Sequence, residues 1–299
     1  MKYTLISEQF KNNIRMKKLV FFFLLVATAI PAVQSQYLNV ATYNLRNENS
    51  GDYQQGNGWS KRCPVVCELV RYHDFDVWGA QEVLHSQLMD LLNNLNEYSY
   101  VGAGRDDGKT QGEYVPVFYK KDRFTCLKSG HFWLSPVTDK PNKGWDAAYL
   151  RICTWLQLQE TGTNRIFWYF NIHLDNEGVV ARDESVKLVL NKINEMCGSE
   201  PVILAGDFNV DQHDECFTQL KASDRLTDTF EAAKIRYALN GTFNDFSLNE
   251  FSDSRIDHIF VSSEFDVNRY GILTDSYRDS TSIRFPSDHF PVNVELKWK

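Results

Sequence analysis

Four short apolar runs in the sequence end in polar side chains, and this feature most constrains the fold. Apolar runs of four to eight residues between turn signals are typical of buried strands. In open α/β sheets the carboxyl ends of strands face a crevice, so side chains far apart in sequence can meet there. The runs and their polar ends are 38–43 with Asn44, 76–80 with Glu82, 166–172 with His173 and Asp175, and 201–205 with Asp207 and Asn209.

Helical patterns separate these strands. The stretch 61–72 carries Pro64, which suits a first helical turn. Leucines recur at helical spacing over 84–95, and apolar residues do so over 186–196. The runs 150–159 and 166–172 flank the turn 161–164, which predicts a hairpin. Further strands are expected at 114–119, 124–134, 256–261 and 290–298. Parallel and antiparallel strands with covering helices predict an α/β sandwich.

The first 35 residues are interpreted as a signal peptide, with a possible start at Met16. Lys17 and Lys18 precede an apolar run over 19–30, and Val33 and Ser35 suit a cleavage site. That run is shorter than the roughly 20 residues that span a bilayer, so no stable membrane insertion is expected. We therefore expect one domain over 36–299, exported as a monomer to the periplasm, cell surface or medium. Its six cysteines permit disulfides without fixing their pairing.

Without this leader the chain is strongly acidic. The whole chain has a net charge of −7, and the leader carries five basic side chains and one acidic one, so residues 36–299 carry −11. A surface of that sign repels polyphosphate at long range. Nucleic-acid binding by counterion release is therefore disfavoured unless metal ions intervene.

The polar residues at the strand ends suit phosphate-ester hydrolysis. Carboxylates such as Glu82 and Asp288 fit Mg²⁺, which takes few protein ligands and keeps several waters. His173 and His289 suit acid–base work near neutral pH. Taken singly, each residue has a simpler explanation as a turn former or a helix cap. Their shared position at strand ends favours the catalytic interpretation.

The chain resembles the endonuclease/exonuclease/phosphatase superfamily, which includes deoxyribonuclease-, apurinic endonuclease- and deadenylase-like enzymes as well as secreted bacterial members. The resemblance runs in order over residues 38–298. It rests on Thr42–Arg46 (TYNLR), Gln81–Val83 (QEV), Glu113–Tyr114 with Phe118–Lys120, Asn171–Asp175 (NIHLD), Gly206–Asn209 (GDFN), Arg255–Phe260 (RIDHIF) and Ser287–Val292 (SDHFPV). It implies a four-layer α/β sandwich, in which two mixed β-sheets pack face to face and are covered by helices.

The resemblance also implies roles for individual residues. Glu82 would be the main Mg²⁺ ligand, with Asn44 and Asp288 nearby and Mn²⁺ as a substitute ion. Asp207 would position or deprotonate the attacking water, and Asn209 would hold a phosphate oxygen. Two carboxylate–histidine pairs would flank the phosphate, His289 with Asp257 and His173 with Glu113. Arg182, nine residues after His173, is a further candidate for phosphate contact. The polar loop 102–112 is a candidate rim.

The predicted function is a Mg²⁺-dependent phosphodiester hydrolase, first of all a nuclease of endonuclease or 3′–5′ exonuclease type. The preference for nucleic acid rests on the twin carboxylate–histidine pairs and on export, which would place the enzyme where extracellular nucleic acid can be scavenged. The alternative is a phosphatase or phosphodiesterase acting on inositol phosphates or sphingomyelin-like lipids. A catalytically dead binding module is the rival outside the enzymes, although all the implied ligands are present. The sequence lacks the His-Glu-x-x-His motif of metalloproteases and the Gly-x-Ser-x-Gly motif of serine hydrolases.

Overall fold

Two mixed sheets pack face to face in the computed structural model, which describes residues 36–237, 239–249 and 252–299. The predicted leader lies outside these ranges. The first sheet has, in spatial order, β10 (Ile235–Tyr237), β12 (Phe265–Ile272), β15 (Val292–Trp298), β1 (Tyr37–Asn44), β2 (Val77–Gln81), β4 (Val117–Lys120) and β3 (Tyr98–Val101). The second has β5 (Phe124–Trp133), β6 (Ile152–Glu160), β7 (Ile166–His173), β8 (Val202–Asp207), β11 (Asp257–Val261) and β9 (Thr227–Asp228).

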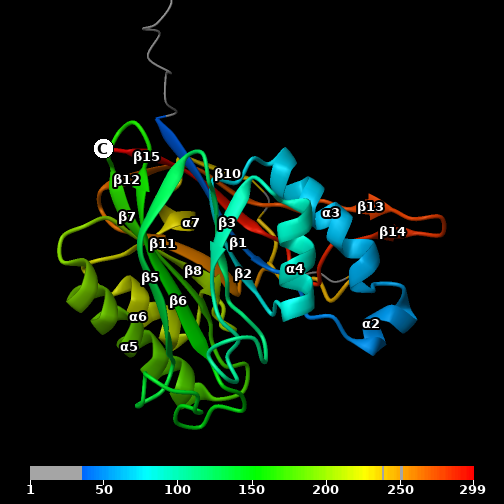
Figure 1. Ribbon diagram of the computed structural model, residues 1–299, viewed down its shortest axis with the longest axis horizontal. Coiled ribbons are helices and arrows are strands. Elements are labelled where there is room, and N and C mark those ends of the chain that lie inside the picture. Colours follow the sequence, from blue (N-terminus) through cyan, green and yellow to red (C-terminus); the bar gives the residue numbers. More distant parts are fainter. Residues whose placement is uncertain (1–35, 238, 250–251) are drawn as a thin grey trace, which may run out of the picture. The chain divides into compact units, whose positions relative to one another are not determined.

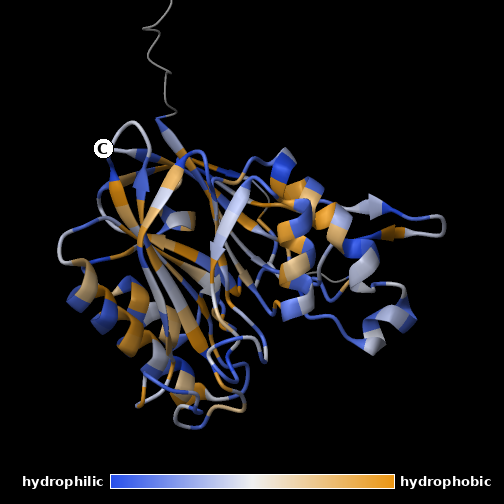
Figure 2. Cartoon of the chain, viewed as in Figure 1, coloured by the Kyte–Doolittle hydropathy of each residue, from blue (hydrophilic) through white to orange (hydrophobic). Residues whose placement is uncertain are grey.

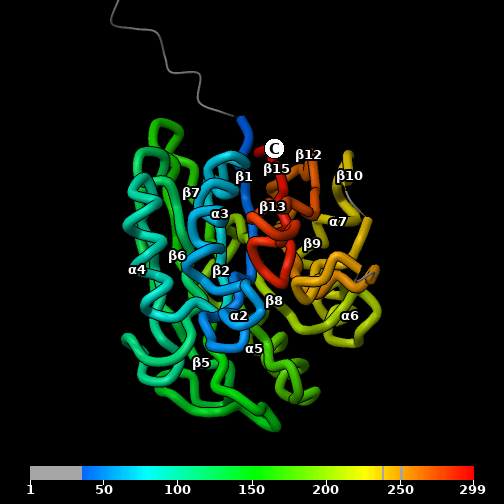
Figure 3. The backbone as a smooth tube through the Cα atoms, turned by 90° about the vertical axis from the view of Figure 1, so that its right-hand side faces the viewer, coloured from blue at the N-terminus to red at the C-terminus, as the bar shows by residue number. Residues whose placement is uncertain are grey.

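Helices cover the outer faces of both sheets (Figure 1). Those beside the first sheet are α3 (Trp59–Tyr72) and α4 (His85–Asn94), and those beside the second are α5 (Val179–Cys197) and α6 (Glu215–Lys221). Short helices α2 (Ser50–Gln55) and α7 (Thr229–Ala232) lie in connections. A ribbon of β13 (Tyr277–Arg278) and β14 (Ile283–Arg284) lies near α2 (Figure 3), where Arg284 donates to the Gln55 carbonyl at 3.2 Å. The predicted four-layer sandwich is confirmed.

Three apolar layers hold the sandwich together. Val40, Ile203 and Val294 belong to the layer between the two sheets. A second layer joins the first sheet to α3 and α4, and a third joins the other sheet to α5 and α6. Figure 2 shows the apolar faces of these helices and strands in orange and the more polar faces in blue. Burial of these layers is the main favourable contribution to folding.

The strand directions bring the predicted residues to one edge of the sandwich. β1 runs parallel to β2, and β7 runs parallel to β8, so each pair ends at the same place. β11 begins beside the end of β8, with Asp257 opposite Asp207 in the register. β15 is antiparallel to β1 and begins beside its end. Residues that precede β15 therefore lie next to Asn44.

A buried polar contact joins the two sheets just below this edge. Tyr169 accepts a hydrogen bond from the Gly79 amide at 2.9 Å and donates to the Ala41 carbonyl at 2.8 Å. Asn171 donates to the Ala80 and Pro116 carbonyls. A Cβ on Gly79 would lie 2.6 Å from the Asn171 side chain, so glycine is needed for this close approach. These bonds fix the two sheets relative to each other beneath the strand ends.

Some elements differ from the sequence predictions. The strand expected over 114–119 begins at Val117, because Pro116 cannot donate a ladder hydrogen bond. β12 was not predicted, because a bulge between Val267 and Arg269 breaks its alternation. All six cysteines lie in the described ranges and are free thiols. Within those ranges, no helix combines the length and the apolar character that crossing a bilayer requires.

Candidate active site

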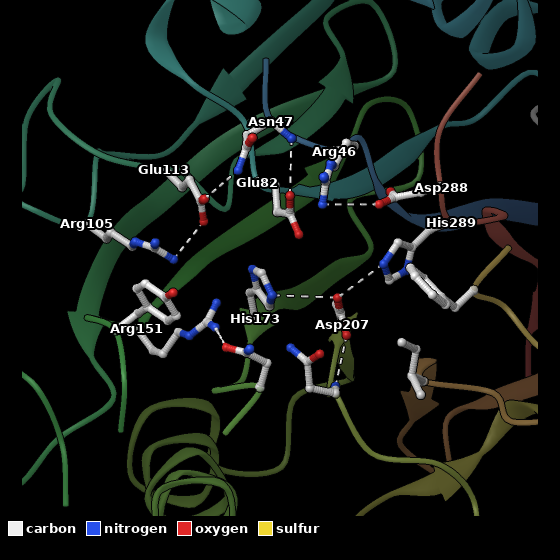
Figure 4. Close-up of a pocket in the computed structure, with 15 residues that line it drawn as sticks. Arg46, Asn47, Glu82, Arg105, Glu113, Arg151, His173, Asp207, Asp288 and His289 are labelled. Atoms are coloured by element: carbon white, nitrogen blue, oxygen red, sulfur yellow. Dashed lines mark hydrogen bonds and ion pairs between the residues drawn. The ribbon is translucent and has the colours of Figure 1, made fainter. Parts of the chain in front are cut away.

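A cavity of about 530 Å³ opens where the strand ends meet (Figure 4). Small-molecule sites commonly have volumes of roughly 300–1,000 Å³. The cavity is lined by Arg46, Asn47, Glu82, Arg105, Glu113, Tyr149, Arg151, His173, Asn176, Asp207, Asn209, Phe243, Ile256, Asp288 and His289. Six of the residues predicted from the sequence therefore share one cavity with Asp207: Glu82, Glu113, His173, Asn209, Asp288 and His289.

His289 lies between two carboxylates. Its Nδ1 is 2.9 Å from Asp257 Oδ2, and its Nε2 is 3.9 Å from Asp207 Oδ2. Burial alone would lower the pKa of His289, but the charge and hydrogen bond of Asp257 raise it well above the usual histidine value. The imidazole is therefore cationic at neutral pH. The predicted contact between His289 and Asp257 is present, and its catalytic role stays a prediction.

His173 lies on the other side of Asp207. Its Nε2 is 3.6 Å from Asp207 Oδ2. Burial, together with the charges of Arg151 and Arg105, lowers the pKa of His173 well below the usual value. This imidazole is therefore neutral. Burial and the neighbouring charge of Asp257 raise the pKa of Asp207, so Asp207 is a stronger base than an exposed aspartate.

The predicted contact of His173 with Glu113 is absent among the described residues, and a role for Glu113 beside His173 stays a prediction. Glu113 Oε2 forms an ion pair with Arg105 Nη1 at 2.7 Å, and Glu113 Oε1 accepts from Asn47 Nδ2 at 3.0 Å. Both carboxylate oxygens therefore have partners other than the imidazole. The loop 102–112 supplies the reason, because it folds back and places the Arg105 guanidinium at the cavity wall. The prediction that this loop contributes to the rim is confirmed.

Glu82 directs its carboxylate into the cavity (Figure 4). Its backbone lies in the left-handed region at φ +60°, which is uncommon for residues other than glycine. The Asn47 amide donates to Glu82 Oε2 at 3.1 Å, and Asn44 Nδ2 donates to Glu82 Oε1 at 3.1 Å. Asn44 also donates to Asp207 Oδ2 at 2.9 Å. Asn44 thus orients two carboxylates, and its own Oδ1 accepts from the Arg46 amide at 3.0 Å.

Asp288 lines the cavity on the same side as His289 (Figure 4). Arg46 Nη1 is 3.4 Å from Asp288 Oδ2, and the Ser287 hydroxyl lies 3.3 Å from Asp288 Oδ1. Burial and the negative charge of Glu82 raise the pKa of Asp288, although the nearby cationic His289 lowers it. Two carboxylates therefore face one cavity, with the Arg46 guanidinium on the side of Asp288.

This donor set fits a hard divalent cation. Glu82 and Asp288 supply carboxylate oxygens, the ligands that Mg²⁺ prefers in proteins. Asp207, Asp257 and His289 also place ligand atoms within 4.8 Å of one another. However, Asp257 Oδ2 already binds His289 Nδ1 at 2.9 Å, so this second group has fewer ligand atoms free for an ion. Glu82 and Asp288 would hold the ion, with Asn44 positioning Glu82.

Asn209 lies at the cavity, whereas Arg182 lies beside it. Asn209 lines it, and its Nδ2 donates to the Leu174 carbonyl at 2.9 Å. Arg182, predicted to contact phosphate, is not among the lining residues. It lies in the first turn of α5, and its Nη1 donates to the Asp175 carbonyl at 3.0 Å. This contact directs the guanidinium to a neighbouring depression.

Several lining residues were not given roles from the sequence. Arg151 Nε donates to Asp175 Oδ2 at 3.2 Å, and Arg151 Nη2 donates to Asn176 Oδ1 at 2.9 Å. Tyr149 is 48% exposed, and the guanidinium carbons of Arg105 and Arg151 lie within 5.6 Å of its ring centre. Phe243 lies in a loop and packs edge-on against His289.

Comparison with known proteins assigns the family. The sequence model of the Endonuclease/Exonuclease/phosphatase family matches residues 41–289. The chain belongs to this family. It is therefore a phosphoric ester hydrolase, and the enzymes of this family generally use divalent metal ions.

Solved structures of family members are similar over nearly the whole described chain. A mannosyl-6-phosphatase from Bacteroides thetaiotaomicron is 49% identical, with a TM-score of 0.86, and the match covers 87% of this chain and 100% of that one. A family protein from Bacteroides vulgatus is 35% identical, with a TM-score of 0.82 over 88% and 99% of the two chains. D. rerio TDP2, solved with a single-strand DNA product, is 18% identical with a TM-score of 0.69 over 88% and 100%, which shows a shared fold alone.

Proposed function

We propose that this protein is a phosphomonoesterase that removes phosphate from the 6-position of a sugar such as mannose. The observation that carries this proposal is the ion pair of Glu113 with Arg105 at 2.7 Å. The preference for a nuclease rested on a second carboxylate–histidine pair and on export, and Glu113 makes its contacts with Arg105 and Asn47 instead of with His173. The chain is 49% identical to a mannosyl-6-phosphatase over that protein's whole solved chain, and this similarity also supports a sugar phosphomonoesterase.

The size and charge of the site also support a small substrate. A cavity of about 530 Å³ falls within the range of small-molecule sites. The net charge of −11 expected for the chain without its leader disfavours a long polyanion. The nuclease remains the second candidate, because D. rerio TDP2 shares the fold.

Several residues of the cavity have their own roles in the proposed reaction. Water attacks phosphorus and the bond to the sugar oxygen breaks; the departing oxygen takes a proton from solvent water, which releases inorganic phosphate and the free sugar. Asp207 accepts the proton of the attacking water, since its raised pKa makes it a suitable base. The cationic His289 stabilises negative charge on the phosphoryl oxygens, and Asp257 keeps it protonated. Asn209 would hold another phosphoryl oxygen.

Glu82 and Asp288 would hold a Mg²⁺ ion, or Mn²⁺ in its place. When bound, the cation neutralises charge on the phosphate and favours attack. Export by the leader over residues 1–35 belongs to the same proposal. It would place the enzyme where phosphorylated glycans from outside the cell are accessible.

A substrate panel tests the proposal. Protein lacking residues 1–35 is incubated with Mg²⁺ and with mannose 6-phosphate, inositol polyphosphates, sphingomyelin or single- and double-stranded oligonucleotides at matched phosphate concentration. We expect the highest kcat/KM with mannose 6-phosphate. Faster cleavage of oligonucleotides would instead favour the nuclease, and preference for inositol phosphates or sphingomyelin would favour the other alternative.

A further inference from the structure

Four hydrogen-bonding side chains of the cavity take no part in the proposed reaction. Arg105, Glu113, Tyr149 and Asn176 form this group, which we call the polar wall. Figure 4 shows Arg105 and Glu113 on the side of the cavity away from Asp288 and His289. Phe243 and Ile256 supply apolar surface to the cavity. The cavity therefore offers fixed donors and acceptors on the polar wall.

The polar wall is held rigidly by residues behind it. Glu113 is fixed by Arg105 and Asn47 at 2.7 and 3.0 Å. Asn176 Oδ1 accepts from Arg151, whose side chain is 6% exposed and is also paired with Asp175. A rigid constellation of this kind loses little conformational entropy when a ligand binds.

The wall also has unused hydrogen-bonding capacity. A carboxylate oxygen can accept more than one hydrogen bond, so Glu113 can accept from a ligand in addition to Arg105 and Asn47. Two guanidinium groups beside one cavity also repel each other, and the charge of Arg105 contributes to lowering the pKa of Arg151 after burial. A ligand that supplies oxygen atoms would relieve this repulsion.

We propose that the polar wall binds the hydroxyl groups of the sugar that carries the scissile phosphate. This inference rests on the proposed function. With the phosphate between Glu82 and His289, the sugar ring extends toward Arg105 and Glu113. Glu113 accepts from ring hydroxyls, while Arg105 and Asn176 donate to hydroxyl oxygens. The exposed ring of Tyr149 borders this space and covers apolar C–H groups of the sugar.

The chemistry of the wall favours a polyol over a nucleobase. Hydroxyl groups both donate and accept, which matches a carboxylate beside a guanidinium and an amide. The exposed ring of Tyr149 suits the face of a sugar and the face of a base alike, so the preference for a polyol rests on Glu113, Arg105 and Asn176. Glu113 therefore acts in substrate specificity, instead of orienting His173 as the sequence suggested.

Two substrates that differ in the leaving group test this assignment. Mannose 6-phosphate carries ring hydroxyls, whereas 4-nitrophenyl phosphate carries none. We expect Glu113→Gln to lower kcat/KM for mannose 6-phosphate by roughly 10- to 100-fold, the value of a hydrogen bond with a charged group, and Asn176→Ala to lower it by roughly 3- to 10-fold, the value of a neutral one. Neither variant should lower kcat/KM for 4-nitrophenyl phosphate by more than about twofold. Asn176 is exposed, so its variant tests the wall even if Glu113→Gln folds poorly.

Monodeoxy analogues of mannose 6-phosphate identify the hydroxyl that is bound. Removing that hydroxyl should lower kcat/KM for the wild type and have little further effect in Glu113→Gln. Glu97→Gln is the matched control, because Glu97 forms an ion pair with Arg71 at 2.8 Å outside the cavity. This control should leave both substrates unaffected.

Two negative outcomes can be told apart. If the wild type hydrolyses mannose 6-phosphate and the variants lose both substrates equally, the hydroxyl assignment is overturned and the proposed function stands. Such a result would place Glu113 in the chemical step. If the wild type hydrolyses 4-nitrophenyl phosphate but not mannose 6-phosphate, the proposed function fails, and the assignment fails with it.

Discussion

Asp257 Oδ2 lies 2.9 Å from His289 Nδ1, and the two side chains are almost completely buried. The other imidazole nitrogen, Nε2, is directed toward Asp207 at 3.9 Å (Figure 4). A buried carboxylate that binds one ring nitrogen fixes the orientation of the imidazole and stabilises its cationic form. Asp257 does not line the cavity, so its direct contact with the site is through His289, while its charge also raises the pKa of Asp207.

This relationship predicts a non-additive double mutant. His289→Ala and Asp257→Asn should each lower kcat roughly 10²-fold or more, because each disables the same imidazole. The double variant should be little slower than the slower single variant. Steady-state rates of the three variants check this. Multiplication of the two single losses would show that Asp257 does not serve His289.

Removing the charge of Glu82 should abolish activity without unfolding the protein. Glu82→Gln keeps the shape of the side chain but weakens the binding of a hard cation. We expect turnover to fall below detection and the Mg²⁺ titration to lose its saturation, while the circular dichroism spectrum stays unchanged. Chelation of the wild type by excess EDTA should have the same effect, and Mg²⁺ should reverse it.

Glu68→Gln provides the control for this experiment. Glu68 is an exposed residue of α3, so loss of its charge should leave turnover unaffected. Full turnover of the wild type in excess chelator would exclude the proposed role of the cation.

We expect Arg62 to position the two chain segments that form the cation site, one after Asn44 and one before Asp288. Its guanidinium is completely buried and donates to the carbonyls of Leu45, Arg46, Asn57 and Pro286 at 2.7–3.0 Å. Leu45 follows Asn44, and Pro286 lies two residues before Asp288. Because an ammonium group cannot reach all four carbonyls, Arg62→Lys should lower the free energy of unfolding by about 2–4 kcal/mol.

The positioning role has its own measurement. Arg62→Lys should also raise the Mg²⁺ concentration needed for half-maximal activity, measured at a temperature where the variant is fully folded. The matched control is Arg71→Lys, which alters an exposed guanidinium paired with Glu97. An unchanged Mg²⁺ titration in Arg62→Lys would limit Arg62 to structural stability.

The strand-end residues could be predicted from the sequence because backbone geometry places them. Asn44, Glu82, His173 and Asp207 each follow a buried apolar run, and parallel pairing brings such ends together whatever the loops do. Asp257 and Asp288 lie just at or before the starts of antiparallel strands, so they reach the same edge.

The choice of partners within the cavity could not be predicted in the same way. The sequence offers Glu113 two partners, the His173 imidazole and the Arg105 guanidinium. The path of the loop 102–112 decides which of them Glu113 contacts. Arg182 similarly depends on the turn between β7 and α5, which places the Asp175 carbonyl within its reach. Tyr149 and Asn176 lie in loops whose sequences also suit ordinary packing. Periodicity carries no information about such contacts, because they depend on side-chain direction in irregular segments.

Asp175 should make the stability of the protein depend on pH in acid. Although burial alone would raise its pKa, hydrogen bonds from the amides of Gly178, Ala148 and Tyr149, together with the charge of Arg151, lower it to about 2. A carboxylate with a lowered pKa in the folded state stabilises the protein above its unfolded pKa, roughly 4. This stabilisation is lost as the pH falls from about 4 through about 2.

Asp175→Asn should therefore reduce the free energy of unfolding at pH 7 by on the order of 1–2 kcal/mol, and the difference from the wild type should shrink progressively below pH 4. Urea denaturation from pH 7 to pH 2 measures this difference, with Asp122→Asn, at an exposed position, as the control. A difference that stays constant over that range would show that Asp175 contributes through its shape and not through its charge.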